Sequence, residues 1–321
     1  MISREEALDV YQQLRTIRSF EERLDTMMKA GKLAGFLHLY VGQEAVAVGV
    51  CSHLNERDYV SSNHRGHGHC IAKGVDLRGM MAELFGRQTG ICKGKGGSMH
   101  IADIDLGMIG ANGIVGAGIP LTVGAALTAS IKKTGGVAIA FFGDGATNQG
   151  QFHEALNLAA TWKLPAVFIL ENNGYGEATP LEFAAPMTDL AVRAKSYAMH
   201  SLVADGMDFF DVFEKAGEAI ERARNGEGPT LVECKTYRFL GHFVGDPIGY
   251  RSDEELNDWK ENRDPLPTFE EKAIEMGLVS EEALRRIDAE VTAEIDAAVE
   301  AAEAAPFPSP EDVLTDVYVT E

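Results

Sequence analysis

The sequence lacks any run of about 18 apolar residues, the length that a helix needs to cross a bilayer, so no membrane span is expected. Cysteine is scarce, and its four residues form no CxxC pair, which fits a reduced protein better than a disulfide framework. Positive charge is also in short supply. The net charge of -20 repels phosphate backbones and anionic lipids, which excludes nucleic acids and membranes as expected partners.

The N-terminal residues contain neither an apolar signal core nor an Arg-rich transit pattern, so we expect a cytoplasmic location. Glycine, by contrast, is abundant, and many of the 34 glycines fall in residues 86–118 and 143–150. The stretch 86–120 shows little periodicity, and an ordered loop of that length usually carries function.

Hydrophobic periodicity predicts alternating strands and helices. An apolar run at 137–142 stops at Gly143, a helical stretch follows at 151–162, and a second apolar run occupies 166–170. This spacing is typical of a βαβ unit in a parallel sheet. Further helices are expected at 43–50, 119–131 and 208–225, and further strands at 202–204 and 230–234. The alternation predicts an α/β fold with a doubly wound, mainly parallel sheet and helices on both faces.

We expect a single domain over residues 1–305, followed by a C-terminal arm over 306–321. The domain should begin with a helix at 4–30, where a capping box precedes a helical apolar stripe. It should end with a helical region at 268–305.

Hard oxygen ligands follow both strands of the βαβ unit. Asp144 follows the first strand and Asn173 the second, and ligands bind at the carboxyl ends of strands in open parallel sheets. A carboxylate with an amide oxygen suits a Mg²⁺ ion that also coordinates a phosphate. The backbone N–H groups of Gly143 and Gly145 can face the same anion.

Each half of this pattern alone is usually a turn, but the two together, with 26 residues between Gly145 and Asn172, resemble the signature of thiamine-diphosphate-binding proteins. From about residue 5 to 320 the chain resembles the α subunits of pyruvate and acetoin dehydrogenases. The segments that carry the resemblance are 143–150, 171–176, 94–100, 113–117, 38–39, 42–45 and 241–242. The resemblance implies a thiamine-diphosphate-binding fold.

The resemblance also implies site residues. Asp144, Asn173 and the backbone carbonyl of Tyr175 match the family's magnesium ligands. His242 matches a histidine that faces the reaction centre, and His38 one that lies near the substrate. The positions expected to contact the cofactor are His64, Arg65, Gly113, Val115, Gly143, Gly145, Ala146 and Arg238.

Two positions depart from the family pattern. His64 stands where the family usually has a tyrosine that contacts the cofactor. Phe243 stands where animal pyruvate enzymes carry a phosphorylated serine, so kinase control is not expected there.

The implied activity is the decarboxylation of pyruvate or the cleavage of acetoin, with transfer of the acyl group to a lipoyl group. The carboxylate that activates the cofactor's aminopyrimidine lies on a separate β subunit in this family. The expected partners are therefore that β subunit, in an assembly of two α and two β chains, and the lipoyl domain of an acyltransferase.

Other interpretations stay open at this stage. His64, His67 and His69 surround Arg65 and could form a metal-binding tract. A P-loop or a dinucleotide fingerprint is not expected, because the glycine spacing fits neither. A non-catalytic subunit, or one specific for branched-chain 2-oxo acids or another acyloin, is the alternative function.

Overall fold

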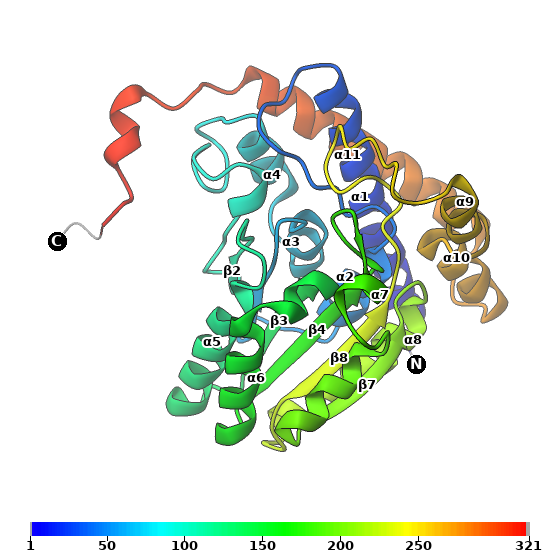
Figure 1. Ribbon diagram of the computed structural model, residues 1–321. Helices are drawn as coiled ribbons and strands as arrows, with labels where there is room; N and C mark the ends of the chain where they lie inside the picture. The colour runs from blue at the N-terminus through cyan, green and yellow to red at the C-terminus, as the bar shows by residue number, and fades with distance from the viewer. Residues whose placement is uncertain (1, 319–321) are drawn as a thin grey trace.

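The computed structural model describes residues 2–318. A six-stranded sheet, in the order β2-β1-β3-β4-β8-β7, has only parallel pairings among its described strands (Figure 1). The strands are β1 (Tyr59–Ser61), β2 (Met108–Gly110), β3 (Ala138–Gly143), β4 (Ala166–Asn172), β7 (His200–Asp205) and β8 (Thr230–Lys235). A separate two-stranded antiparallel hairpin pairs β5 (Tyr175–Gly176) with β6 (Thr179–Pro180).

Both faces of the sheet are buried, and alternate residues of its strands enter two different cores. In β3, Ile139 and Phe141 belong to one core, whereas Ala140 and Phe142 belong to the other. Side chains on successive strand residues point to opposite faces, so an almost continuous apolar run is what a sheet covered on both sides requires.

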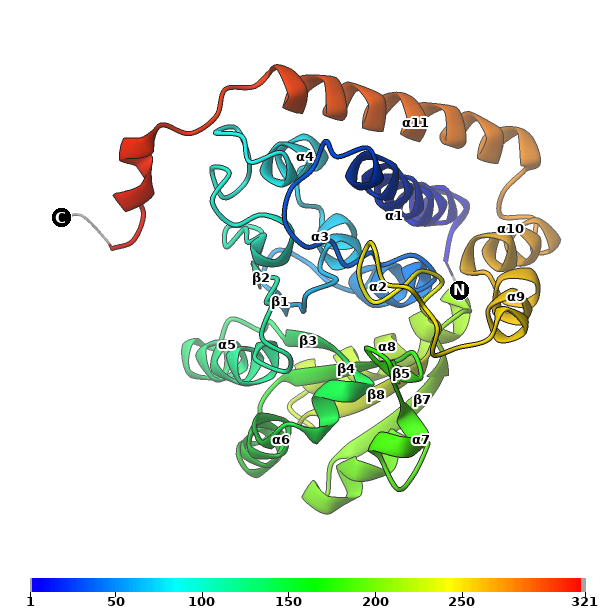
Figure 2. The ribbon, with the colours of Figure 1, turned by 45° about the horizontal axis from the view of Figure 1, so that its top comes forward.

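The helices divide between these two cores (Figures 1 and 2). The second core holds α5 (Gly118–Lys132) and α6 (Gly150–Trp162). The first core holds α1 (Arg4–Lys29), α2 (Glu44–Cys51), α3 (His67–Lys73), α4 (Leu77–Leu84), α8 (Phe209–Arg224), α10 (Pro265–Glu275) and α11 (Glu281–Ala304). The short α7 (Leu181–Ala184) and α9 (Asp253–Asn262) complete the α-helices of the described chain. The predicted α/β class with a mainly parallel sheet is confirmed.

The helix expected at 4–30 is α1, which starts with the capping box of Ser3 and Glu6 and ends at Lys29. The region expected at 268–305 contains most of α10 and all of α11. The division into one domain and an arm stays a prediction, and residues 319–321 of that arm lie outside the described part of the chain.

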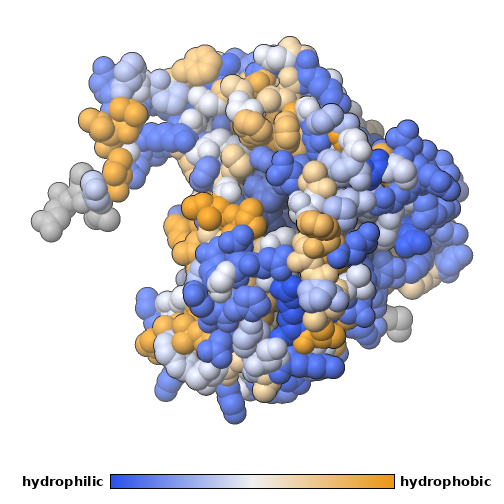
Figure 3. All heavy atoms as spheres, viewed as in Figure 1, coloured by the Kyte–Doolittle hydropathy of each residue, from blue (hydrophilic) through white to orange (hydrophobic). Residues whose placement is uncertain are grey.

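The described part of the arm leaves the end of α11 and extends away from the sheet (Figures 1 and 2). Apolar side chains are visible on it in Figure 3, and Leu314 is 83% exposed. Among the described helices, none is both long enough and apolar enough to cross a membrane.

The order of the strands creates a switch point in the sheet. β1 and β3 are neighbours, but β2 lies beyond β1 and β4 lies beyond β3. The connections that follow β1 and β3 therefore diverge, and such a crevice at the carboxyl ends of the strands is where open α/β sheets bind ligands.

One buried carboxylate organises the glycine-rich loop after α4. Glu83 is 1% exposed and accepts backbone hydrogen bonds from Cys92, Gly94, Gly96 and Gly97 at 2.8–3.0 Å. The loop contains little regular structure of its own, so these backbone N–H groups have no partners in a helix or sheet. The carboxylate of Glu83 provides the acceptors that they need.

Substituting Glu83→Gln is expected to lower the free energy of unfolding by about 3 kcal/mol or more, because the amide nitrogen cannot accept two of the four bonds. Urea denaturation measures the change. Glu56→Gln, at an exposed glutamate, is the control and should change it by less than ~0.5 kcal/mol. Equal denaturation midpoints for the two variants would contradict the assigned role.

Candidate functional site

A cavity of about 280 Å³ opens at the carboxyl ends of β1, β3, β4 and β8. It brings together eleven of the residues proposed from the sequence, although five separate segments of the chain contribute them. These are His64, Arg65, Val115, Gly143, Asp144, Gly145, Ala146, Asn173, Tyr175, Arg238 and His242. The clustering is a consequence of the switch point, which collects loops distant in sequence.

Gly113 and His38 do not line this cavity. Gly113 lies close to Met99 in the glycine-rich loop, where an added Cβ would stand 3.7 Å from its sulfur. The His38 ring packs behind the cavity wall, with its centroid 4.8 Å from that of His64 and 5.1 Å from that of His242. His38 is therefore placed to act on the cavity through these two rings.

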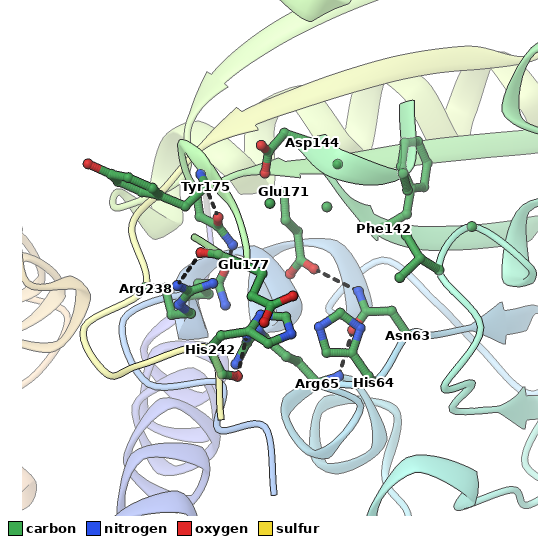
Figure 4. Close-up of a pocket in the computed structure, with 18 of the residues that line it drawn as sticks. Asn63, His64, Arg65, Phe142, Asp144, Glu171, Tyr175, Glu177, Arg238 and His242 are labelled. Carbon is green, nitrogen blue, oxygen red and sulfur yellow. Dashed lines mark hydrogen bonds between the residues drawn. The ribbon is translucent and has the colours of Figure 1, made fainter. Parts of the chain in front are cut away.

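Of the proposed cation ligands, Asp144 and Asn173 follow β3 and β4, and Tyr175 begins β5. Asp144 and Tyr175 are labelled in Figure 4. Asp144 is 3% exposed, and burial raises the pKa of its carboxyl to about 6. No side chain in residues 2–318 forms a hydrogen bond or ion pair with this carboxylate, so a divalent cation would provide the missing countercharge. The Asn173 amide donates to Oε1 of Gln43 at 3.2 Å, and its side-chain oxygen accepts from the backbone N–H of Tyr175 at 3.3 Å.

Two buried arginines supply positive charge to the same cavity. Arg65 donates to the carbonyl of Leu39 at 2.9 Å and of His242 at 2.7 Å, while Arg238 donates to the carbonyl of Glu177 at 3.2 Å. Neither guanidinium has a carboxylate partner among the described residues. Burial, and then the charge of Arg238, lower the pKa of Arg65 to about 9. Buried unpaired charge of one sign is costly, so this pair fits a bound anion.

Three imidazoles pack together beside the arginines. Burial lowers the pKa of His242 to about 3 and of His38 to about 4, and it lowers that of His64 well below its usual range, so all three are neutral near pH 7. Arg65 donates to Nδ1 of His242 at 3.1 Å, which places the His242 proton on Nε2. His242 can therefore donate a hydrogen bond from Nε2.

The loop that carries His242 is organised by one carboxylate. Asp246 accepts hydrogen bonds from the backbone N–H of His242 at 2.7 Å and from the hydroxyl of Tyr250 at 2.6 Å. Tyr250 in turn accepts from Arg238 at 2.7 Å. This chain connects the orientation of His242 to that of the second arginine.

The interpretation of residues 64–69 as a metal-binding tract is wrong. His67 is hydrogen bonded to Glu21 at 3.0 Å and to Ser98 at 2.9 Å. His69 is hydrogen bonded to Glu171 at 3.0 Å and to Ser62 at 2.7 Å, so both rings have used both nitrogens. No group of three His, Cys, Asp or Glu side chains within residues 2–318 is arranged to hold a metal.

The structure adds cavity residues that sequence analysis missed, among them Gln43, Asn63, Glu171 and Glu177. Glu171 is 2% exposed and is hydrogen bonded to Tyr40, His69 and Asn63. The position of Glu171 directly before the paired asparagines was the feature of the sequence that could have identified it as a cavity residue. The Nε2 atom of Gln43, in the cavity lining, is buried without a partner among the described atoms. Unsatisfied donors and acceptors at a cavity are expected where a ligand completes the hydrogen bonding.

Comparisons with known proteins find relatives along nearly the whole chain. The family model described as "Dehydrogenase E1 component" matches residues 12–311. The α subunits of acetoin:2,6-dichlorophenolindophenol oxidoreductase from Bacillus subtilis and Cupriavidus necator are each 53% identical to this chain. The alignments cover 99% of this chain and 95% and 96% of those proteins. The α subunit of the pyruvate dehydrogenase E1 component from Zymomonas mobilis is 45% identical, over 98% of this chain and 89% of its own length.

Inorganic pyrophosphate with Mg²⁺ is expected to raise the melting temperature of the protein. The pyrophosphate would neutralise the two arginines, and the Mg²⁺ would neutralise Asp144. At 100 times its dissociation constant, a ligand adds about 2.7 kcal/mol of stability. Differential scanning fluorimetry measures the shift, which Asp144→Asn should reduce strongly and Asp105→Asn, at an exposed aspartate, should not. A shift that survives in Asp144→Asn would contradict the assignment of the cation site.

Proposed function

The chain belongs to the dehydrogenase E1 component family, and from this premise we propose that it is the α subunit of a thiamine-diphosphate-dependent dehydrogenase acting on acetoin or pyruvate. The observation that supports the cofactor most strongly is the cavity itself. It combines a buried carboxylate that lacks a countercharge with two buried arginines that lack an anion. A diphosphate bridged to Mg²⁺ satisfies both deficits at once.

We assign the cation to Asp144, the side-chain oxygen of Asn173 and the backbone carbonyl of Tyr175. Arg65 and Arg238 would bind the diphosphate, and the backbone at Gly145 and Ala146 would contact it. Gly145 has Gly176 against it, so that neither residue projects a side chain between the two loops. Among the remaining proposed contacts, Gly143, His64 and Val115 line the cavity, and Gly113 lies outside the lining.

Thiamine diphosphate, when bound, supplies a carbon nucleophile for the substrate carbonyl and a ring that accepts the electron pair of the broken bond. The chain's own residues bind, orient and donate protons. His242 would donate from Nε2 to a developing oxygen on the substrate, and Arg65 would hold its ring through Nδ1. His38 would support this orientation from behind, through its ring contact with His242.

We propose a β subunit as the first partner, because the relatives are themselves α subunits. The β chain would supply the carboxylate that activates the aminopyrimidine, in an assembly of two α and two β chains. The lipoyl domain of an acyltransferase would receive the acyl group. The cytoplasmic location stays a prediction.

The higher identity to the acetoin enzymes supports acetoin as the first substrate, and the 45% identity to a pyruvate enzyme supports pyruvate as the second. A non-catalytic subunit is disfavoured by the complete set of Asp144, Asn173 and both arginines. A branched-chain 2-oxo acid or another acyloin is the remaining alternative to test.

The direct test is co-expression with a β subunit from the same genome, followed by acetoin-dependent reduction of 2,6-dichlorophenolindophenol. Activity is expected in the co-purified complex and should require both thiamine diphosphate and Mg²⁺. Asn173→Ala should abolish it by removing a cation ligand. Full activity of the isolated chain, or activity independent of thiamine diphosphate, would refute the proposal.

Replacing His242 by Ala is expected to lower acyl transfer to a lipoyl domain at least ~100-fold, the usual range for losing a positioned proton donor. The melting-temperature shift with thiamine diphosphate and Mg²⁺ should remain, because His242 is not one of the cation ligands. His153→Ala, at an exposed histidine, is the control. An unchanged transfer rate would remove His242 from the mechanism.

A further inference from the structure

Glu177 is the first of two turn residues at the tip of the β5–β6 hairpin, where it lines the cavity. Its φ of 56° lies in the left-handed region, which glycine adopts freely and a glutamate rarely does. Non-glycine residues in such conformations collect at functional sites, where the surrounding structure maintains them. Its place in the cavity lining, together with this backbone conformation, makes its side chain a candidate for a functional role.

Contacts from the neighbouring loop maintain the conformation of Glu177. Arg238 donates to its backbone carbonyl at 3.2 Å, and the hydroxyl of Tyr250 accepts from the same guanidinium nitrogen at 2.7 Å. The same loop carries His242. The side chain of Glu177 points from the hairpin toward His242 (Figure 4). Its carboxylate therefore faces the end of the cavity that the proposed proton donor lines.

The carboxylate of Glu177 differs from the other two in the lining. Asp144 and Glu171 are buried, and Glu171 is already bonded to Tyr40, His69 and Asn63. Glu177 is exposed, and within residues 2–318 its carboxylate forms neither a hydrogen bond nor an ion pair. Its negative charge is therefore free to act on a molecule that enters the cavity.

Acetoin and pyruvate, the substrates in the names of the relatives, would interact differently with the negative charge of Glu177. Both contain an acetyl carbonyl, but pyruvate carries a carboxylate on it, whereas acetoin carries a hydroxyethyl group. A carboxylate near Glu177 is repelled, while a hydroxyl donates a hydrogen bond to it. Rejection of one partner by like charge is a common source of specificity.

We propose that Glu177 is a specificity-determining residue that selects uncharged 2-hydroxyketones over 2-oxo acids. This inference rests on the proposed function of the same cavity. In this proposal the side chain of Glu177 contacts the substituent beside the reacting carbonyl and so distinguishes acetoin from pyruvate. The cation ligands and arginines bind the part of the site that both substrate classes share.

The test compares kcat/KM for acetoin and for pyruvate in the assembled complex. Glu177→Gln should lower the acetoin-to-pyruvate ratio by about tenfold or more, with most of the change coming from faster use of pyruvate. Glu177→Gly removes the carboxylate and also relieves the backbone strain, because glycine accepts the positive φ. If the charge determines the selectivity, the acetoin-to-pyruvate ratio should fall in this variant as it does in Glu177→Gln. Glu182→Gln removes an equal charge from the adjacent exposed α7 and should leave the ratio unchanged.

A second readout does not depend on turnover. Calorimetry on the complex loaded with thiamine diphosphate measures the binding of oxamate, an unreactive anion shaped like pyruvate, and of 2,3-butanediol, an uncharged counterpart of acetoin. Glu177→Gln should tighten oxamate binding by about tenfold and leave butanediol binding equal or weaker.

An unchanged ratio and unchanged oxamate affinity in Glu177→Gln would overturn the inference while leaving the proposed function intact. A wild-type complex that prefers pyruvate to acetoin would also overturn it. Absence of thiamine-diphosphate-dependent activity toward either substrate would instead refute the proposed function.

Discussion

The structure depends on an unbalanced arrangement of charge at the carboxyl edge of its parallel sheet. One carboxylate, Asp144, is buried without a side-chain partner, and two guanidiniums, Arg65 and Arg238, are buried without an anion. Each of these states costs free energy, which backbone hydrogen bonds to the same groups offset only in part. A cation joined to a diphosphate removes both costs, and for this reason the cavity is best understood as half of a site that its ligand completes.

The fold produces this arrangement through its topology. The chain leaves β1 and β3 toward opposite edges of the sheet, so the loops that follow them separate and expose their backbone. Two cores, one on each face, hold these strands in register and keep the loop ends in place. Single carboxylates then shape the surrounding loops. The buried Glu83 accepts backbone hydrogen bonds across the glycine-rich segment, and the partly buried Asp246 orients the loop of His242. The charged side chains are therefore positioned by the rigid packing of the sheet and by loops whose conformation these carboxylates fix.

Sequence patterns predicted the parts of the fold that are local. Strands β3 and β4 could be predicted because both faces of the sheet are buried, which makes their sequences continuously apolar. The three-residue strands β1 and β2 were missed, since so short a segment has no measurable period, and strand order depends on pairing between distant segments. In the site, spacing alone suggested Asp144 and Asn173, whereas Arg65 and His242 required the family resemblance. Glu177 could not be recognised, because its signal is a backbone angle.

The central claim is that Asp144, Asn173 and the carbonyl of Tyr175 hold a divalent cation against a bound diphosphate. Its most direct measurement is the anomalous scattering of Mn²⁺ in crystals of the assembled complex grown with thiamine diphosphate. A manganese peak is expected within about 2.5 Å of an oxygen from each of the three residues and of the diphosphate. A peak at other ligands, or a diphosphate bound with no cation beside Asp144, would contradict it.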